Sequence, residues 1–471
     1  MPALTFNDAV RLAAATVNHP VVRGIKVVVV RDVVGRIRFA VDALRPTEAP
    51  VREAPVQGKP GDDSEPRELP VEAFNVLAEA GNRLGPYAAH PLIVFRDDLG
   101  NPRTILENED IHEAIIDSVG PDADVAREYT VNLLDRQIVG QDWLNTQALS
   151  DRSTRPPRVV FYGLKGGVGR STALAMFAYS LAREGKRVLL IDFDLESPGL
   201  SGLLLPKEGN PSAYGIVDWF VEDAVNPEGN DVIENLVVSS PLSKRTDGEI
   251  RVAPAISANE SAYLSKLARV YVDVPGKNGP QRFGDRAKRL VEALETAEKP
   301  DIVLIDSRAG LHDLAAISIS TLADLSLLFA TDGQQTWEGY RQLFLHWNRR
   351  PMVLRYIRER LAFVRSMLPE TNQAEVFESF RSRSYALFSD YMYDEIKPKG
   401  QGDDTVDEAD KFNFPFDDGD APHHPLTIRW SLRLVEFDPL RDEANGGVGD
   451  ADIDFAFKPF VDRVKSLVFE D

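Results

Sequence analysis

The chain has 471 residues, of which 43% are hydrophobic, and it contains no cysteine. This length predicts two domains with sizeable cores, and the lack of cysteine excludes disulfides and thiolate chemistry. A formal net charge of −20 disfavours a general affinity for nucleic acid or anionic membranes. The N-terminus lacks the pattern of a signal peptide, and no stretch reaches the roughly 18 apolar residues of a membrane span. We therefore expect a cytoplasmic protein without a membrane partner.

Residues 1–135 are expected to form a small α+β domain. Two β-branched runs within residues 25–41 flank a turn at Gly35, which predicts a hairpin preceded by a helix. Residues 45–70 are rich in proline, glycine and charge and contain few large apolar side chains, so we expect a mobile loop there.

The remainder of this domain predicts a second hairpin and a helix. The hairpin is expected within residues 91–106 with its turn near Gly100, and helical periodicity follows over residues 111–134. Residues 136–157 have the composition of an interdomain linker, so we expect the second domain to span residues 158–471.

From residue 158 onward, apolar strands alternate with helical stretches. This alternation predicts an α/β domain with a mostly parallel sheet and helices on both faces. The expected strands are RVVFYG, RVLLIDFD, DIVLIDS, ADLSLLFAT and LAFVRSML. Two polar insertions interrupt the pattern, at residues 206–248 and 399–425. The second is acidic, which favours a solvated loop and leaves an interaction segment as the alternative.

The strongest motif is GLKGGVGRST, which lies between the first of these strands and an amphipathic helix. A phosphate chain needs converging backbone N–H groups, glycines let a loop curl closely around it, and the following helix N-terminus adds a favourable dipole. Ser171 stands where a hydroxyl ligand for Mg²⁺ is required. The predicted nucleotide-binding residues are Gly163, Lys165, Gly166, Gly167, Val168, Gly169, Arg170, Ser171 and Thr172.

Arg170 occupies the position where this kind of loop usually carries lysine. The charge is kept, but a guanidinium is a larger planar fork, so it binds β- and γ-phosphate oxygens in a different geometry. The rate of hydrolysis is therefore open.

Two other expected strands end in carboxylates. Asp192 and Asp194 close RVLLIDFD, and strand alternation places both on the same side at the edge where open α/β sheets bind ligands. Asp306 closes the apolar strand of DIVLIDS, as a Walker B acid that holds a metal-bound water, and Gly310 lets the next loop sense a γ-phosphate. The expected metal-binding residues are Ser171, Asp192 and Asp306.

The early lysine, the GGVGRST loop and these acids together resemble the deviant Walker A motif of the MinD/ParA family, in the signal-recognition-particle and MinD (SIMIBI) class of P-loop proteins. The resemblance covers residues 158–330. It implies that Lys165 reaches across a two-fold interface to phosphates bound by a second subunit, and that Asp194 orients the attacking water. It also implies that Asp192 lies near Mg²⁺. Lys165, Asp194 and Arg170 are thus the candidate catalytic residues.

Arg308 is a departure, since family members commonly have proline there. It either stabilises transition-state charge as an arginine finger does or pairs with an acid of the switch loop, and we favour the pairing. The arginine-rich segment 349–365 lies where ParA-like proteins carry a DNA-contacting surface, but pairing with neighbouring acids is favoured. The final helix, within residues 459–469, has an apolar stripe and few cations, so docking onto the core is favoured over membrane binding.

These patterns predict an ATPase with ATP and Mg²⁺ as cofactors, ATP over GTP resting on the family likeness. We expect a slowly hydrolysing molecular switch that forms a homodimer on ATP and couples to an unknown protein partner through its N-terminal domain. One alternative is an ATP-dependent dimeric scaffold or regulator with little hydrolysis, as in a bacterial defence or signalling system. Another, disfavoured by the acidic charge, is a ParA-like DNA partitioning ATPase.

Overall fold

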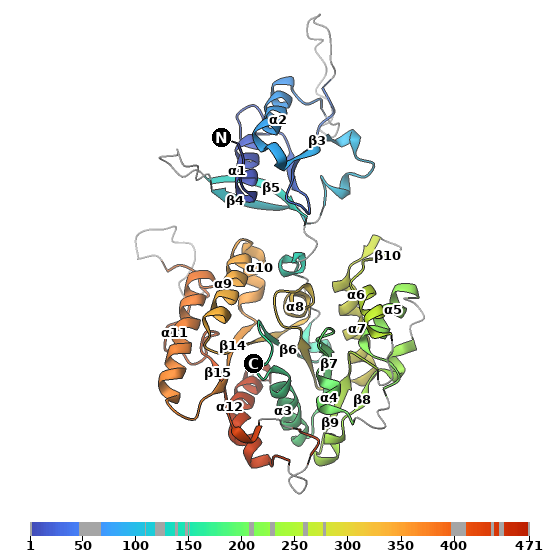
Figure 1. The fold of residues 1–471 in the computed structure, drawn as a ribbon, viewed down its shortest axis with the longest axis vertical. Coiled ribbons are helices and arrows are strands. Elements are labelled where there is room, and N and C mark those ends of the chain that lie inside the picture. The colour runs from blue at the N-terminus through green and yellow to red at the C-terminus, as the bar shows by residue number, and fades with distance from the viewer. Residues whose placement is uncertain are drawn as a thin grey trace, which may run out of the picture. The chain divides into compact units, whose positions relative to one another are not determined.

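The structure, a computed structural model, separates the chain into two units, residues 1–141 and 142–471 (Figure 1). It describes residues 2–46, 67–108, 110–117, 128–136, 140–146, 149, 151–206, 212–226, 231–257, 262–276, 279–396, 411–434, 438–441 and 447–469. Within these ranges, no helix has the length and apolar character needed to cross a lipid bilayer.

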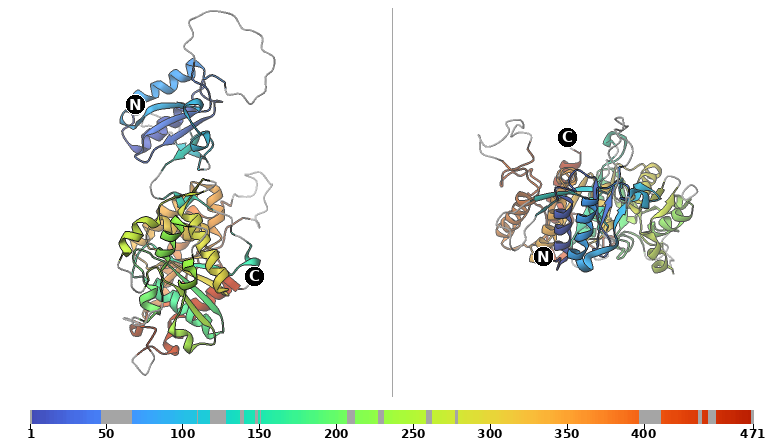
Figure 2. Two further views of the ribbon diagram at one scale, coloured as in Figure 1. Left: turned by 90° about the vertical axis from the view of Figure 1, so that its right-hand side faces the viewer. Right: turned by 90° about the horizontal axis from the view of Figure 1, so that it is seen from above.

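The first unit is a five-stranded sheet in the order β3-β2-β1-β5-β4. Helices α1 and α2 cover one face, where Val10, Phe39 and Leu77 are buried (Figure 2). The β1–β2 and β4–β5 pairs are antiparallel, while β1–β5 and β2–β3 are parallel. The elements are α1 (Phe6–Val17), β1 (Val27–Arg31), β2 (Ile37–Val41), α2 (Val71–Leu84), β3 (Ala88–Phe95), β4 (His112–Asp117) and β5 (Glu128–Asp135).

The expected helix and first hairpin are confirmed, but the second hairpin and the helix after it are wrong. Gly35 turns between β1 and β2 with a φ of +93°. Strand β3 instead pairs with β2, and the chain after it forms short 3₁₀ turns that place Ile105 and Leu106 on the second face of the sheet. Residues 112–117 and 128–135 are strands because their apolar side chains alternate between two faces. Of the expected loop, residues 47–66 lie outside the described residues.

The second unit is an eight-stranded sheet in the order β15-β14-β13-β6-β12-β7-β9-β8. Every neighbouring pair is parallel except β8 with β9, which confirms the mostly parallel α/β fold. Its strands are β6 (Arg158–Gly163), β7 (Arg187–Phe193), β8 (Val238–Ser239), β9 (Glu249–Ala253), β12 (Ile302–Ser307), β13 (Leu325–Ala330), β14 (Leu361–Leu368) and β15 (Leu426–Arg429), with β10 (Val274–Gly276) and β11 (Gly279–Gln281) as a separate hairpin.

Helices cover both faces of this sheet, and each face has its own apolar core (Figure 1). Side chains of α3 (Arg170–Arg183), α4 (Leu200–Leu204) and α12 (Asp450–Phe469) form one core with the strands. The other core takes side chains from α5 (Ile216–Val225), α7 (Phe283–Glu298), α8 (Asp313–Ile317), α9 (Gln334–Asn348), α10 (Pro351–Arg358) and α11 (Gln373–Tyr391), with α6 (Tyr263–Val270) at its margin. Phe460 and Val464 are fully buried, so the final helix docks onto the core as expected.

Several segments expected to be polar connections contribute to the second unit. Trp143 is buried, its carbonyl accepts the indole N–H of Trp347 at 2.9 Å, and it lies in the second unit rather than in a linker. Residues 216–225 form α5, with Trp219 buried, so the expectation of an irregular insertion is wrong there. In the acidic insertion, residues 399–410 lie outside the described residues, and Phe412 packs against Tyr393.

The arginine-rich segment is largely engaged within the fold. Arg358 makes a two-pronged ion pair with Asp394 at 2.7 and 2.9 Å. The guanidinium of Arg360 stacks 3.9 Å from the centre of the Tyr356 ring. The Arg358 pair matches the pairing interpretation, whereas Arg360 stacks on an aromatic ring and Arg349 and Arg355 are exposed.

Candidate functional site

The glycine-rich segment forms the turn between β6 and α3. Gly167 and Gly169 both have a φ of +75°, a conformation that favours glycine, and Gly169 caps the N-terminus of α3. A Cβ at Gly166 or Gly167 would meet no protein atom within 4 Å, so these positions face open space. Gly163 is tighter, because a Cβ there would lie 3.3 Å from Val168. The turn therefore has the shape of an anion cradle at a helix N-terminus.

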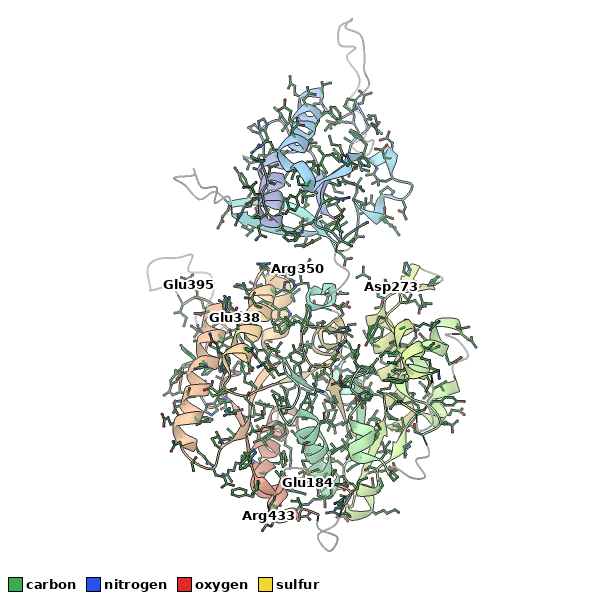
Figure 3. All side chains as sticks on the ribbon, viewed as in Figure 1. Glu184, Asp273, Glu338, Arg350, Glu395 and Arg433 are labelled. Atoms are coloured by element: carbon green, nitrogen blue, oxygen red, sulfur yellow. The ribbon has the colours of Figure 1, made fainter. Side chains whose placement is uncertain are left out.

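A pocket of about 500 Å³ lies against this turn. The first residues of α3 line this pocket, and Glu184, labelled in Figure 3, caps the opposite, C-terminal end of that helix. The pocket brings together every predicted nucleotide-binding residue except Gly163 with two segments that follow the neighbouring strands β7 and β12. Its lining residues are Lys165, Gly166, Gly167, Val168, Gly169, Arg170, Ser171, Thr172, Asp194, Glu196, Ser197, Arg308 and Ala309.

Arg170 turns toward carboxylates rather than into open space. Its Nε donates to Asp306 at 2.5 Å and its Nη2 to Asp194 at 2.8 Å, and only 9% of its side chain is exposed. Two carboxylates that would otherwise repel each other are thus held by one guanidinium. Sequence reasoning foresaw a cation at this position but not its orientation, because the orientation depends on strands far away in the sequence.

Ser171 and Asp306 form the expected pair at the start of α3. The Ser171 hydroxyl donates to the second Asp306 oxygen at 2.6 Å, so both oxygens of this carboxylate are engaged. Asp306 is the penultimate residue of β12, next to β6, and its side chain is 1% exposed. Burial raises the pKa of Asp306, an effect that the neighbouring Arg170 charge and the Ser171 hydrogen bond oppose.

Asp192 has a different environment from the one expected of a metal ligand. One oxygen accepts the backbone N–H of Asp194 at 3.2 Å, and the other accepts those of Gly199 and Leu200 at 3.2 and 3.1 Å. Burial raises its pKa well above the ordinary value. These hydrogen bonds hold the loop that joins β7 to α4, so the structure gives Asp192 a role in organising that loop.

The residues present fit Mg²⁺ through a small donor set. No three His, Cys, Asp or Glu side chains of the described ranges are grouped to hold a metal ion. Magnesium in phosphate sites commonly uses one or two carboxylates and completes its shell with phosphate oxygens and water. Ser171 and Asp306, already 2.6 Å apart at the helix N-terminus, supply such a set beside the cradle.

Lys165 lies at the pocket with its Nζ donating to Oε1 of Gln335 at 2.6 Å. Gln335 belongs to the first turn of α9, which also approaches the neighbouring residue of the loop. A Cβ at Gly339 would lie 2.7 Å from a methyl group of Leu164, so the glycine allows this close approach. Helix α9 thereby fixes the beginning of the phosphate loop, a contact that the sequence did not reveal.

Arg308 forms an ion pair with Glu196 at 2.6 Å. The expected pairing is thus confirmed, but its acid belongs to the loop after β7 rather than to the switch loop after β12. The Tyr271 hydroxyl donates to the same Glu196 oxygen, and its ring lies edge-on to that of His312, 5.4 Å between centres. Burial and the Arg308 charge both lower the pKa of His312. Glu196 and Tyr271 were missed by sequence reasoning, because the contacts that join them to Arg308 link segments far apart along the chain.

A mostly parallel α/β sheet, with a glycine loop between β6 and α3 and a Ser–Asp pair on adjacent elements, defines a P-loop nucleotide-binding domain. Residues 159–325 match the family model of the CobQ/CobB/MinD/ParA nucleotide binding domain. This part of the chain is therefore a MinD/ParA-like P-loop domain.

Individual relatives match the same part of the chain. It is 26% identical over 162 residues to the iron-sulfur cluster carrier protein of Pseudomonas fragi, which covers 34% of this chain and 55% of that protein. It is 30% identical over 179 residues to the chloroplastic septum site-determining minD homolog of Arabidopsis thaliana, covering 37% and 45%. The chain thus spans about half the length of these curated relatives. A solved ParA family ATPase from Chlorobium tepidum TLS aligns with a TM-score of 0.38 at 14% identity, covering 60% of this chain and 89% of that one.

Proposed function

We propose that this protein is a Mg²⁺-ATP-binding molecular switch that dimerises on ATP, hydrolyses it slowly, and acts on a protein partner through its first unit. The observation that carries the proposal is the glycine cradle with two open positions, Gly166 and Gly167, beside the Ser171–Asp306 pair. Backbone N–H groups of the cradle and the N-terminal dipole of α3 would hold the phosphates. Ser171 and Asp306 would hold Mg²⁺, which supplies charge neutralisation when bound.

Dimerisation on ATP rests on Lys165. Its Nζ has an exposed hydrogen bond to Gln335, so the ammonium can change partners at small cost. We propose that it reaches the phosphates held by a second copy. Light scattering of the pure protein with Mg²⁺ and a non-hydrolysable ATP analogue should show a dimer. The variant Lys165→Ala should bind the analogue and remain a monomer.

Hydrolysis rests on Asp194, which lies in the pocket just after β7. Its carboxylate would orient the attacking water in line with the γ-phosphate and accept a proton from it. A phosphate-release assay should show a loss of at least about 100-fold for Asp194→Ala, in the range of a general acid–base contribution. Asp194→Asn, which keeps the size of the side chain, should lose a similar amount. Equal rates in wild type and both variants would refute the role.

The Arg170 contacts favour a second candidate, an ATP-dependent dimeric scaffold with little hydrolysis. Arg170 binds Asp194 itself at 2.8 Å, so the acid that would place the water is already paired. The variant Arg170→Lys separates the two functions, because an ammonium cannot bridge both carboxylates as a planar fork does. A large gain in phosphate release would support a scaffold that holds nucleotide. An unchanged or lower rate would support the switch.

A further inference from the structure

The loop after β12 is fixed beside the phosphate cradle. The backbone N–H of Gly310 donates to the Gly163 carbonyl at 3.1 Å, and the Tyr162 hydroxyl donates to the Gly310 carbonyl at 3.2 Å. Arg308 lies two residues before Gly310 and lines the pocket. Its backbone is therefore anchored next to the place where phosphates would lie, while its side chain remains 28% exposed.

The two arginines of the pocket differ in how firmly they are held. Arg170 donates to two carboxylates of different strands and is 9% exposed, so releasing it leaves two buried acids facing each other. Arg308 pairs with the single carboxylate of Glu196, which is itself 24% exposed. Breaking that pair returns both groups to a partly solvated environment, where an ion pair contributes little. Arg308 is thus the more readily released of the two arginines.

Glu196 is an incompletely satisfied partner for Arg308. Its Oε1 accepts from both Arg308 and Tyr271, whereas its Oε2 is buried and makes no hydrogen bond to any described residue. A terminal phosphate carries more charge than a carboxylate and offers three oxygens to a planar fork. A triphosphate in the pocket would therefore compete well for the Arg308 guanidinium.

We propose that Arg308 recognises the terminal phosphate: it exchanges Glu196 for the γ-phosphate when a nucleoside triphosphate binds, and stays on Glu196 when a diphosphate binds. This inference rests on the proposed nucleotide binding and adds the residue that distinguishes the two nucleotides. Arg170 remains with its two acids, and Arg308 supplies the mobile positive charge. Glu196 and Tyr271 act as positioning residues that hold Arg308 in its observed conformation in the absence of a γ-phosphate.

The test is calorimetric binding of the full chain to a non-hydrolysable ATP analogue and to ADP, each with Mg²⁺. Wild type should prefer the triphosphate. Arg308→Gln should lower the affinity for the triphosphate analogue about tenfold, which corresponds to about 1.4 kcal/mol, and change the affinity for ADP less than about twofold. Glu196→Gln removes the competing charge, so it should tighten binding of the analogue. Arg341→Gln removes an exposed arginine that pairs with Glu338 outside the pocket, and should match wild type for both nucleotides.

Arg308→Lys is the control for a folding defect in Arg308→Gln. It keeps the positive charge, so it should retain part of the triphosphate preference. An undiminished preference in Arg308→Gln, or equal losses for both nucleotides in Arg308→Gln and Arg308→Lys, would overturn the inference while leaving nucleotide binding intact. Failure of wild type to bind either nucleotide would overturn the proposed function, and the role of Arg308 with it.

Discussion

Two buried arginines lie at opposite ends of β6 and use the same chemistry differently. Arg158, the first residue of the strand, is fully buried and gives Nε and Nη2 to the two oxygens of Glu295 at 2.6 and 2.8 Å. Arg170, the first residue of α3 beyond the glycine turn that follows the strand, gives the same two nitrogens to Asp306 and Asp194. The first is a closed one-to-one pair, whereas the second holds two acids together beside a pocket.

This difference separates a structural ion pair from a rearrangeable one. The buried Arg158–Glu295 pair has no net charge, so a further cation would not stabilise it. A single guanidinium between two carboxylates leaves one negative charge in excess, so the arrangement can accept a further cation. The pocket end of β6 is thus suited to binding, and the other end to stability.

The largest effect is expected when the closed pair is broken. Arg158→Met leaves Glu295 buried without its partner, so the free energy of unfolding should fall by about 3–5 kcal/mol, as for other broken buried pairs. Urea unfolding followed by circular dichroism measures this loss. Adding Glu295→Leu should recover most of it, because both charges are then gone. A loss below about 1 kcal/mol in the single variant would contradict the comparison.

A smaller, cation-dependent effect is expected at the pocket end. Arg170→Met leaves Asp194 and Asp306 unneutralised, but Asp194 lines the pocket, where water can hydrate it, so the loss should be smaller than at Arg158, about 2 kcal/mol. Millimolar Mg²⁺ should restore part of the melting temperature of this variant and affect wild type less, because there Arg170 already holds the acids. If the variant had the same melting temperature with and without Mg²⁺, the Arg170 contact would be a purely structural ion pair like that of Arg158.

Alanine substitutions at two neighbouring glycines of the cradle distinguish an effect of backbone strain on stability from an effect on nucleotide binding. Gly167→Ala places a side chain at a φ of +75°, which should cost about 1–2 kcal/mol of stability. Gly166→Ala lacks a positive φ and meets no protein atom within 4 Å, so its stability should match wild type. Both added methyl groups would occupy the space that we propose for the phosphates, so calorimetry should show weaker ATP binding in each. Normal ATP affinity in Gly166→Ala would place the phosphates elsewhere.

The sequence predicted those parts of the molecule that depend on local pattern. The strands of the parallel sheet follow from apolar runs, and the cradle follows from the spacing of Gly163, Gly166, Gly167 and Gly169 between a strand and a helix. The first unit was harder, because β3 pairs in parallel with β2 and β5 pairs with β1 across long stretches of chain. Pairing at such distances depends on the whole sheet rather than on the residues of one segment.

Within the site, the sequence identified the charged groups but not their partners. It foresaw the Arg308 pairing without naming Glu196, and it missed Gln335 and Tyr271 entirely. It also expected Asp192 at the metal, which stays a prediction, and it did not foresee that the Asp192 oxygens accept backbone N–H groups of the next loop. Contacts of this kind are set by which strand ends and helix starts meet in the folded sheet, so no spacing along the chain encodes them.

The smallest effect on the free energy of unfolding is expected at His423. This buried side chain is held by hydrogen bonds and has no opposite charge in direct contact. His423 is buried, with Tyr393 at one ring nitrogen and the Phe416 carbonyl at the other, and burial lowers its pKa and that of His424. As the pH falls below about 6.5, the ordinary histidine value, the unfolded chain takes up protons that the folded chain refuses. The free energy of unfolding should therefore be level above that pH and decline below it.

Urea unfolding between about pH 7.5 and 5.5 measures this decline, in the range of the ordinary histidine pKa. His423→Gln should make the slope shallower, because one of three histidines with a lowered pKa, His312, His423 and His424, no longer titrates. His19→Gln, at an exposed position, should keep the wild-type slope. A slope that is unchanged in His423→Gln would mean that the imidazole accepts a proton inside the fold. The environment of His423 would then permit a change of charge, in contrast to the buried ion pairs at either end of β6, whose charges are fixed by their partners.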